Sequence, residues 1–168
     1  MLALLLKRVE ALGVWLAGLG AAIIVVQMLW ISYGVFMRYV VGRPDGTVTE
    51  ATALLLFPAA FLGLAYALKE DAYPKVMFLP DALGPRGRRR LELLNLLLML
   101  AVGGFFAIAA VDATRNSFVS GAASEILLWP RWLFWAPGAV ALVLFTLYVV
   151  LRLAVLLTTP ASSPARRG

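Results

Sequence analysis

The stretch Gly84-Pro85-Arg86-Gly87-Arg88-Arg89-Arg90 lies near the middle of the chain, and the rest of the sequence is organised around it. It places four arginines within five residues, and long apolar runs lie before and after it. Such a cluster cannot be buried, because each buried charge needs a partner. In a membrane protein, Lys and Arg are retained on the cytoplasmic side. The stretch therefore predicts a cytoplasmic loop between two halves of two spans each; the alternative is a solvated loop without a role in topology.

The composition indicates an all-helical integral membrane protein. Of the 168 residues, 62% are apolar and 14% are charged, whereas a soluble domain carries about 25% charged residues. The net charge of +6 could be taken for a nucleic-acid signature. The basic residues cluster at the ends of the apolar runs, however, which favours contact with anionic lipids and argues against nucleic-acid binding.

The sequence has no Cys and no His. Disulfides, thiol chemistry and His-based metal or acid–base sites are therefore excluded. A Gly-rich phosphate loop, a Ser/His/Asp set and a facing pair of carboxylates are not recognisable either. We expect no catalytic residue, no cofactor and no metal, and hence no enzyme.

Four apolar runs, with charged residues only near their ends, predict four transmembrane helices in a single domain, residues 1–168. About 20 apolar residues cross a bilayer core of roughly 30 Å, and the first run is too long for the apolar region of a signal peptide. Pro58 should bend the second helix, because proline removes a backbone donor. The predicted spans are residues 14–37, 51–68, 91–111 and 132–157, followed by a disordered tail at 158–168.

The connection between the second and third spans predicts a short interfacial segment. Residues 73–83 mix apolar side chains with Lys75 and Asp81, and Pro74 and Pro80 argue against a long helix. Such a segment lies in the membrane interface, anchored by its apolar side chains.

The distribution of Lys and Arg predicts the orientation of the chain. Eleven fall on the side of the arginine stretch and four on the other, which places both termini in the cytoplasm. We assign Arg86, Arg88, Arg89 and Arg90 to topology and to lipid-headgroup contact. The inner set is Lys7, Arg8, Lys69, Lys75, Arg86, Arg88, Arg89, Arg90, Arg152, Arg166 and Arg167; the outer set is Arg38, Arg43, Arg115 and Arg131.

Several residues are candidates for contact with a partner chain. Thr47 or Thr49 can cap the second helix, and Glu50 then lies in its first turn, where the helix dipole favours a carboxylate. Capping and partner contact are both open for Glu50. The same question, with lipid contact or solvation as the alternative, applies to Arg38 and Arg43 in the first outer loop and to Trp132 in an aromatic belt.

The second span carries a stripe of small residues, Ala59, Gly63 and Ala67, that repeats every four positions. Small-xxx-small stripes let helices approach closely, either within the chain or against a partner subunit. Gln27 is the mid-span amide of the first helix, and we expect it to bond to a neighbouring helix rather than to a substrate. Gly103-Gly104 permits close packing or a bend in the third span.

No predicted span carries an Asp, Glu, Lys or Arg at its middle. An ion-coupled carrier that works alone usually needs an ionisable group or a broken helix there. The sequence therefore favours a helical scaffold that works beside another subunit.

The chain resembles a known family, the small membrane subunit (DctQ-like component) of tripartite ATP-independent periplasmic (TRAP) transporters, over roughly residues 14–157. The resemblance rests on the order and spacing of several short motifs, since each motif alone is weak. They are Arg38-Tyr39-Val40 with Gly42, Glu50, Phe61-Leu62-Gly63 with Ala65 and Ala67, Lys69-Glu70, Leu79-Pro80, Leu91-Glu92, Ser124, Trp129-Pro130-Arg131-Trp132 and Pro137-Gly138.

The resemblance implies a small subunit in the bacterial inner membrane, paired with a large membrane subunit that holds the sodium and substrate sites. A periplasmic solute-binding protein would deliver a carboxylate-type solute, and the small subunit would stabilise and orient the large one. Arg43, Glu50 and the second outer loop would lie on the face available to these partners. The alternative is a self-assembling tetraspan protein for membrane anchoring or assembly, without a transport role.

Overall fold

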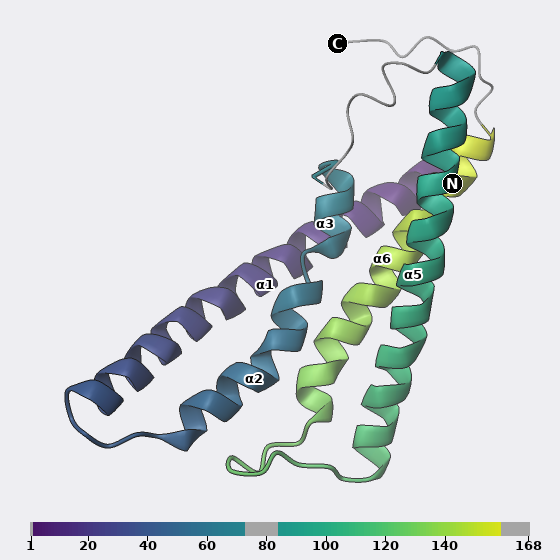
Figure 1. Ribbon diagram of the computed structural model, residues 1–168. Coiled ribbons are helices and arrows are strands. Elements are labelled where there is room, and N and C mark those ends of the chain that lie inside the picture. Colours follow the sequence, from purple (N-terminus) through teal and green to yellow (C-terminus); the bar gives the residue numbers. More distant parts are fainter. Residues whose placement is uncertain (1, 73–83, 159–168) are drawn as a thin grey trace.

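The computed structural model describes residues 2–72 and 84–158 (Figure 1). In this part the chain is all-helical apart from loops and one isolated bridge, and four helical stretches are long and apolar enough to cross a membrane, as the sequence predicts. The predicted interfacial segment at 73–83 and the predicted tail beyond Thr158 lie outside the described residues. The helices are α1 (Leu2–Tyr39), α2 (Gly46–Phe61), α3 (Leu64–Lys69), α5 (Pro85–Val119) and α6 (Trp132–Thr158).

The second span consists of α2 and α3, which are separated at Leu62 and Gly63. Pro58 lies one turn before this break and cannot donate a backbone hydrogen bond. The bonds on either side persist, because Leu62 N donates to Pro58 O at 3.0 Å and Ala67 N donates to Gly63 O at 2.9 Å. The chain nevertheless changes direction between α2 and α3 (Figure 1), so the predicted bend is present, one turn after the proline.

Helix α6 is the centre of the bundle, since it packs against α1, α2, α3 and α5 (Figure 1). One end of the bundle holds the start of α1, the start of α5 and the end of α6 (Figure 1). We call it the inner end, after the orientation that the sequence predicts, and the opposite end the outer end. The buried face of α6 near the inner end joins α1, α3 and α5 in one apolar cluster: Val9, Ala65, Leu68, Leu96, Leu144, Phe145, Tyr148, Val149 and Leu151. A second cluster, nearer the outer end, contains Ala107, Ala110, Ala139 and Leu142, with Phe57, Phe61 and Leu64 packed against it. The bundle therefore depends on apolar contacts along the whole of α6.

Helix α1 packs on α2 and α3 through a stripe that repeats every seven residues, namely Gly13, Gly20, Gln27 and Gly34. A seven-residue repeat keeps one helix face toward its partner. The glycines leave room for the neighbouring helix, and the amide of Gln27 donates across it, so the prediction for Gln27 is confirmed. The pairings are Gly13 with Ala65, Gly20 with Leu62, Gly34 with Val48, and Gln27 Nε2 with Thr52 O at 3.0 Å.

The sides of the bundle expose large apolar residues along most of their length. On α1, the side chain of Trp15 is 80% exposed, and on α5 those of Phe105 and Ile108 are 68% and 67% exposed. Such a surface requires lipid or the helices of another membrane protein around it.

Candidate functional site

The connection between α5 and α6 folds into a compact hairpin, residues 121–131, which we call the outer hairpin. Ser124 N donates to Trp129 O at 2.9 Å, and Arg131 N donates to Ala122 O at 3.0 Å. The Ser124 hydroxyl accepts from Trp129 N at 3.1 Å. Gly121 begins the hairpin with a φ of +63°, a conformation that glycine adopts without strain. The hairpin thus closes on its own backbone.

Glu50 of α2 holds the tip of the outer hairpin. Its carboxylate accepts hydrogen bonds from three consecutive backbone N–H groups, those of Glu125, Ile126 and Leu127. The distances are 3.0 Å from Ile126 N to Oε1 and 2.6 Å from Leu127 N to Oε2. Successive N–H groups that point to one spot form an anion-binding nest. Glu50 therefore links the second span to the loop before the fourth.

Asp45 caps α2, so the prediction of a Thr47 or Thr49 cap is wrong. The Asp45 carboxylate accepts from Thr47 N at 2.9 Å and from the Thr47 hydroxyl at 2.7 Å. The hydrogen bonds from the side chain and the backbone of Thr47 hold the pKa of Asp45 below its ordinary value. Because α2 begins at Gly46, Glu50 lies beyond its first turn, so the predicted place of Glu50 in that turn is wrong as well. Its carboxylate bonds to the outer hairpin instead of capping the helix.

The hairpin tip presents apolar side chains at the outer end of the bundle. Ile126 lies over the first residue of α2, since a Cβ on Gly46 would lie 3.3 Å from Ile126 Cδ1. Leu128 adopts a φ of +54° and is 72% exposed, and Trp129 beside it is also exposed. An exposed apolar group rimmed by polar residues is typical of a protein-contact surface.

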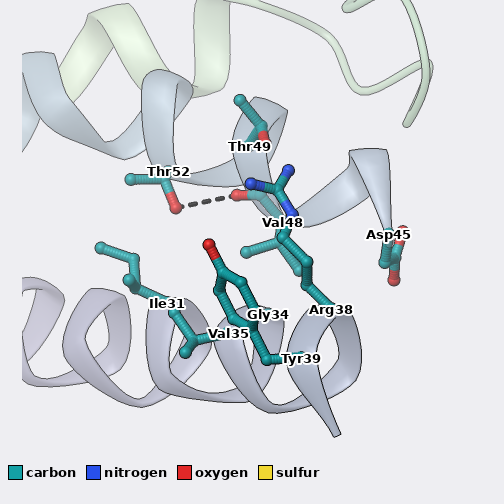
Figure 2. Close-up of a pocket in the computed structure, with 9 residues that line it drawn as sticks. All are labelled: Ile31, Gly34, Val35, Arg38, Tyr39, Asp45, Val48, Thr49 and Thr52. Atoms are coloured by element: carbon teal, nitrogen blue, oxygen red, sulfur yellow. Dashed lines mark hydrogen bonds between the residues drawn. The ribbon is translucent and has the colours of Figure 1, made fainter. Parts of the chain in front are cut away.

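Arg38 lines a cavity of about 330 Å³ between the outer ends of α1 and α2 (Figure 2). Its neighbours in the lining include Tyr39, Asp45 and Thr49. Arg43 is exposed on the connection that follows α1 and does not line this cavity. The structure therefore gives these two predicted arginines different surroundings.

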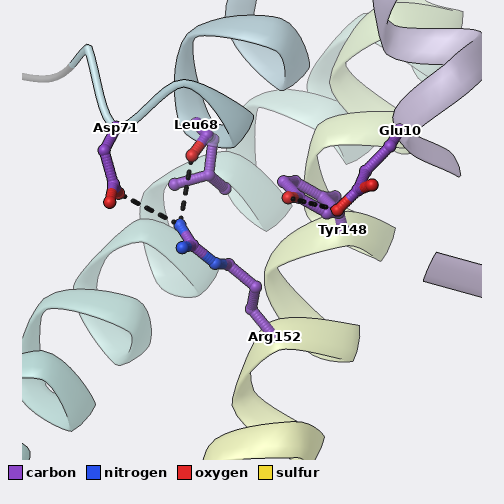
Figure 3. A network of polar contacts seen from close by, with 5 residues as sticks. All are labelled: Glu10, Leu68, Asp71, Tyr148 and Arg152. Carbon is purple, nitrogen blue, oxygen red and sulfur yellow. Dashed lines mark hydrogen bonds and ion pairs between the residues drawn. The ribbon is translucent and has the colours of Figure 1, made fainter. Parts of the chain in front are cut away.

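A polar network ties the inner ends of three helices together (Figure 3). Arg152 Nη1 of α6 donates to Leu68 O at 3.1 Å, at the end of α3, and to Asp71 Oδ1 at 3.3 Å. The Tyr148 hydroxyl of α6 donates to Glu10 Oε1 of α1 at 3.1 Å. Cations near a helix C-terminus interact favourably with its free carbonyls. Arg152 therefore stabilises the C-terminal end of α3 and also forms an ion pair with Asp71.

The arginine stretch begins α5 at this same inner end, so the prediction of a loop there is wrong from Pro85 onward. Arg89 is half-buried, and its Nη2 donates to Leu156 O in the last turn of α6 at 2.7 Å. Arg88 and Arg90 are exposed, whereas the side chain of Arg86 lies outside the described part. Arg89 therefore contacts a helix C-terminus, in addition to the topological role predicted for it.

The remaining candidates are the stripe of small residues on the side of the bundle and Trp132 at the start of α6. Ala59, Gly63 and Ala67 are half-buried, and a Cβ on Gly63 would meet nothing within 4 Å. Trp132 contacts Phe118 edge to face at 5.5 Å and lines an apolar groove of about 550 Å³ between α5 and α6. The predicted residues thus form two groups, one at the outer end and one on the sides, rather than a single pocket.

The described residues contain no group of three or more His, Cys, Asp or Glu placed to hold a metal ion. Sequence reasoning missed the Glu10–Tyr148 contact and the N–H groups at the hairpin tip. No residue type marks the nest, because its donors are backbone atoms of a loop 75 to 77 residues from Glu50. The glycine stripe of α1 was missed too, although its seven-residue repeat can be read from the sequence.

Comparison with known proteins gives one family. The family model described as "Tripartite ATP-independent periplasmic transporters, DctQ component" matches residues 27–159, well over half of the chain. The match covers the last third of α1 and continues through α6. No curated protein and no solved structure matches the chain.

Proposed function

Since the chain belongs to the DctQ component family of tripartite ATP-independent periplasmic transporters, we propose that it is the scaffold subunit of a sodium-coupled secondary transporter. Membership makes it a transporter component rather than an enzyme, and a multi-pass protein of the bacterial inner membrane. The family implies partnership with a large membrane subunit and a periplasmic binding protein. In this proposal, a carboxylate-type solute delivered by the binding protein crosses through the large subunit, which the small subunit stabilises and orients.

One observation carries the scaffold role: the middle of all four spans lacks ionisable side chains. Residues 11–37, 51–68, 93–111 and 132–151 contain no Asp, Glu, Lys or Arg. The mid-span amide of Gln27 is already bonded to α2. Coupling to an ion usually needs ionisable or unwound groups near the midplane. The sodium and solute sites therefore fit better on a partner subunit.

The sides of the bundle supply the surface for that partner. The half-buried residues Ala59, Gly63 and Ala67 present little side-chain bulk on α2 and α3, and a helix of the large subunit can approach closely over small residues. Trp132 and the groove between α5 and α6 offer a second apolar face. We assign these residues to contact with the large subunit.

The outer end supplies the surface for the binding protein. Glu50 holds the hairpin tip in one conformation, and Leu128 and Trp129 are exposed beside it. Arg38 and Arg43 add positive charge at the same end of α1. A preformed loop loses less conformational entropy on binding than a mobile one. Glu50 thus acts as a positioning residue for this contact.

The arrangement of charges supports a cytoplasmic position for both termini. Figure 1 places the start of α1, the start of α5 and the end of α6 at one end of the bundle, which carries Lys7, Arg8, Arg88 to Arg90 and Arg152. Cytoplasmic loops carry the excess of Lys and Arg. The outer hairpin and the α1–α2 connection then face the periplasm.

Co-purification tests the proposal. The chain is expressed with its genomic neighbours and a tag on Gly168. A large membrane protein in stoichiometric amount, and solute uptake in proteoliposomes that requires sodium and the binding protein, are the expected results. If the chain elutes only with itself, the scaffold assignment fails and the self-assembling tetraspan takes its place.

Exchange of Glu50 separates the two contacts. Glu50→Gln should leave the complex with the large subunit intact and weaken uptake that depends on the binding protein, because the hairpin tip loses its anion. Glu92→Gln, an exposed carboxylate at the inner end of α5, is the matched control and should leave uptake unchanged. Equal uptake by both variants would remove the role proposed for the hairpin.

A further inference from the structure

The cavity between α1 and α2 has apolar walls in its deeper part and polar side chains in its outer part. Ile31 and Val35 line its deeper part, and Arg38 and Tyr39 line its outer part in the last turns of α1 (Figure 2). Across the cavity, Val48 comes so close to Gly34 that a Cβ there would lie 2.7 Å from Val48 Cγ1. The volume, about 330 Å³, is that of a small ligand site.

Arg38 brings an unpaired positive charge to this cavity. Within residues 2–72 and 84–158, no hydrogen bond or ion pair engages its guanidinium group. Asp45 also lines the cavity, but its carboxylate accepts from the N–H and the hydroxyl of Thr47, and Figure 2 shows it apart from the Arg38 head group. Arg38 is therefore open to an external anion.

Hydroxyl donors accompany the guanidinium group. Figure 2 shows the Arg38 guanidinium group and the Tyr39 hydroxyl both directed from α1 toward α2, with Thr49 on the facing helix. Thr52 takes no part as a donor, because its hydroxyl donates to Val48 O at 2.8 Å. Arginine and hydroxyl groups together are donors suited to phosphate oxygens.

The geometry points to a phospholipid site, with the lipid phosphodiester on Arg38 and Tyr39 and an acyl chain along Ile31 and Val35. Arg38 lies in the last turn of a membrane-spanning helix, which is the depth of the headgroups. A free phosphate ion would use the charge but not the apolar walls, and the exposed faces of Ile31 and Val35 continue the site toward the lipid chains. The site needs no partner subunit, since all the residues that line the cavity belong to this chain.

Lipid titration followed by native mass spectrometry tests the site. The full-length chain is purified in detergent, stripped of lipid and titrated with phosphatidylglycerol. We expect one lipid held more tightly than the rest, and Arg38→Gln should weaken it by about tenfold, the loss for one hydrogen bond to a charged group. Arg43→Gln removes the same charge five residues further on, outside the cavity, and should bind as the unchanged protein does.

A second variant tests whether the lipid needs the cavity, and two further probes test whether it needs both its phosphate and its acyl chains. Val35→Trp fills the cavity and leaves Arg38 in place, so it should also lose the tight lipid, and thermal melts of both variants check their folding. Diacylglycerol, which lacks the phosphate, and inorganic phosphate, which lacks the chains, should not displace the lipid. Equal weakening by Arg38→Gln and Arg43→Gln, or displacement by either probe, would overturn the assignment.

Discussion

Two adjacent glycines of α5 differ sharply in their surroundings, and their exchange for alanine tests the packing of α5 on α6. A Cβ on Gly103 would lie 2.8 Å from Phe145 Cε1, 3.0 Å from Phe145 Cδ1 and 3.5 Å from Thr146 Oγ1, whereas a Cβ on Gly104 would meet nothing within 4 Å. The Phe145 side chain is only 6% exposed and belongs to the inner apolar cluster. The ring cannot turn aside without disturbing its neighbours.

The magnitude follows from two opposing effects. Alanine favours the helix over glycine by about 1 kcal/mol at either position. Overpacking a filled core costs about 1–3 kcal/mol, and this cost falls on Gly103→Ala alone. Gly104→Ala should therefore be neutral or stabilising by up to about 1 kcal/mol, and the two variants should differ by about 1–3 kcal/mol. Because the helix preference is shared, the difference isolates the contact with Phe145.

The assay is reversible unfolding of the purified chain in mixed micelles, followed by circular dichroism as the fraction of denaturing detergent rises. The two variants should separate clearly, with Gly103→Ala unfolding first. Equal free energies of unfolding, within about 0.5 kcal/mol, would show that α5 and α6 are further apart at this level than the structure has them.

Three further predictions address the outer end, the helix seam and the topology. Glu50→Gln should accelerate amide hydrogen exchange at the tip of the outer hairpin, measured by mass spectrometry, and Glu92→Gln should not; equal exchange in both variants would contradict the hold of Glu50 on the hairpin tip. Gln27→Leu should lower the free energy of unfolding by about 1 kcal/mol, the usual range for a polar bond between membrane helices; no change would mean that the amide bond adds nothing. Because the chain lacks cysteine, Ala123→Cys should react with an impermeant maleimide in whole cells and Ala72→Cys only after lysis, and the reverse pattern would invert the topology.

The fold was predictable because the signals that decide it are local. Uncharged runs of sufficient length give spans, Pro58 gives a bend, and a lone mid-span amide such as Gln27 calls for a partner. The seven-residue glycine repeat of α1 was equally local and could have been used to choose the face that packs on α2. These features depend on residue type and spacing alone.

The site was harder to predict because its partners are far apart in sequence and partly backbone. Asp45 precedes α2 directly and was available as a cap, so the choice of Thr47 or Thr49 overlooked a favourable residue. For Glu50, the nest forms only after the outer hairpin folds and approaches α2. Glu10 and Tyr148 meet because α1 and α6 cross at the inner end. The contact of Glu50 with the hairpin and the contact of Glu10 with Tyr148 each join two distant segments, so no sequence pattern within one helix indicates them.

The basic residues at the inner end illustrate why charge counts cannot separate topology from structure. Arg89 and Arg152 each donate to a carbonyl at the end of a neighbouring helix, α6 and α3 respectively. A guanidinium group has five N–H donors, so each can satisfy a helix end and still offer donors to lipid phosphates. A positive residue at the end of a span is favoured both by retention in the cytoplasm and by the dipole of the adjoining helix. The two causes act on the same positions, and only the contact with a specific carbonyl shows that these arginines also hold the bundle together.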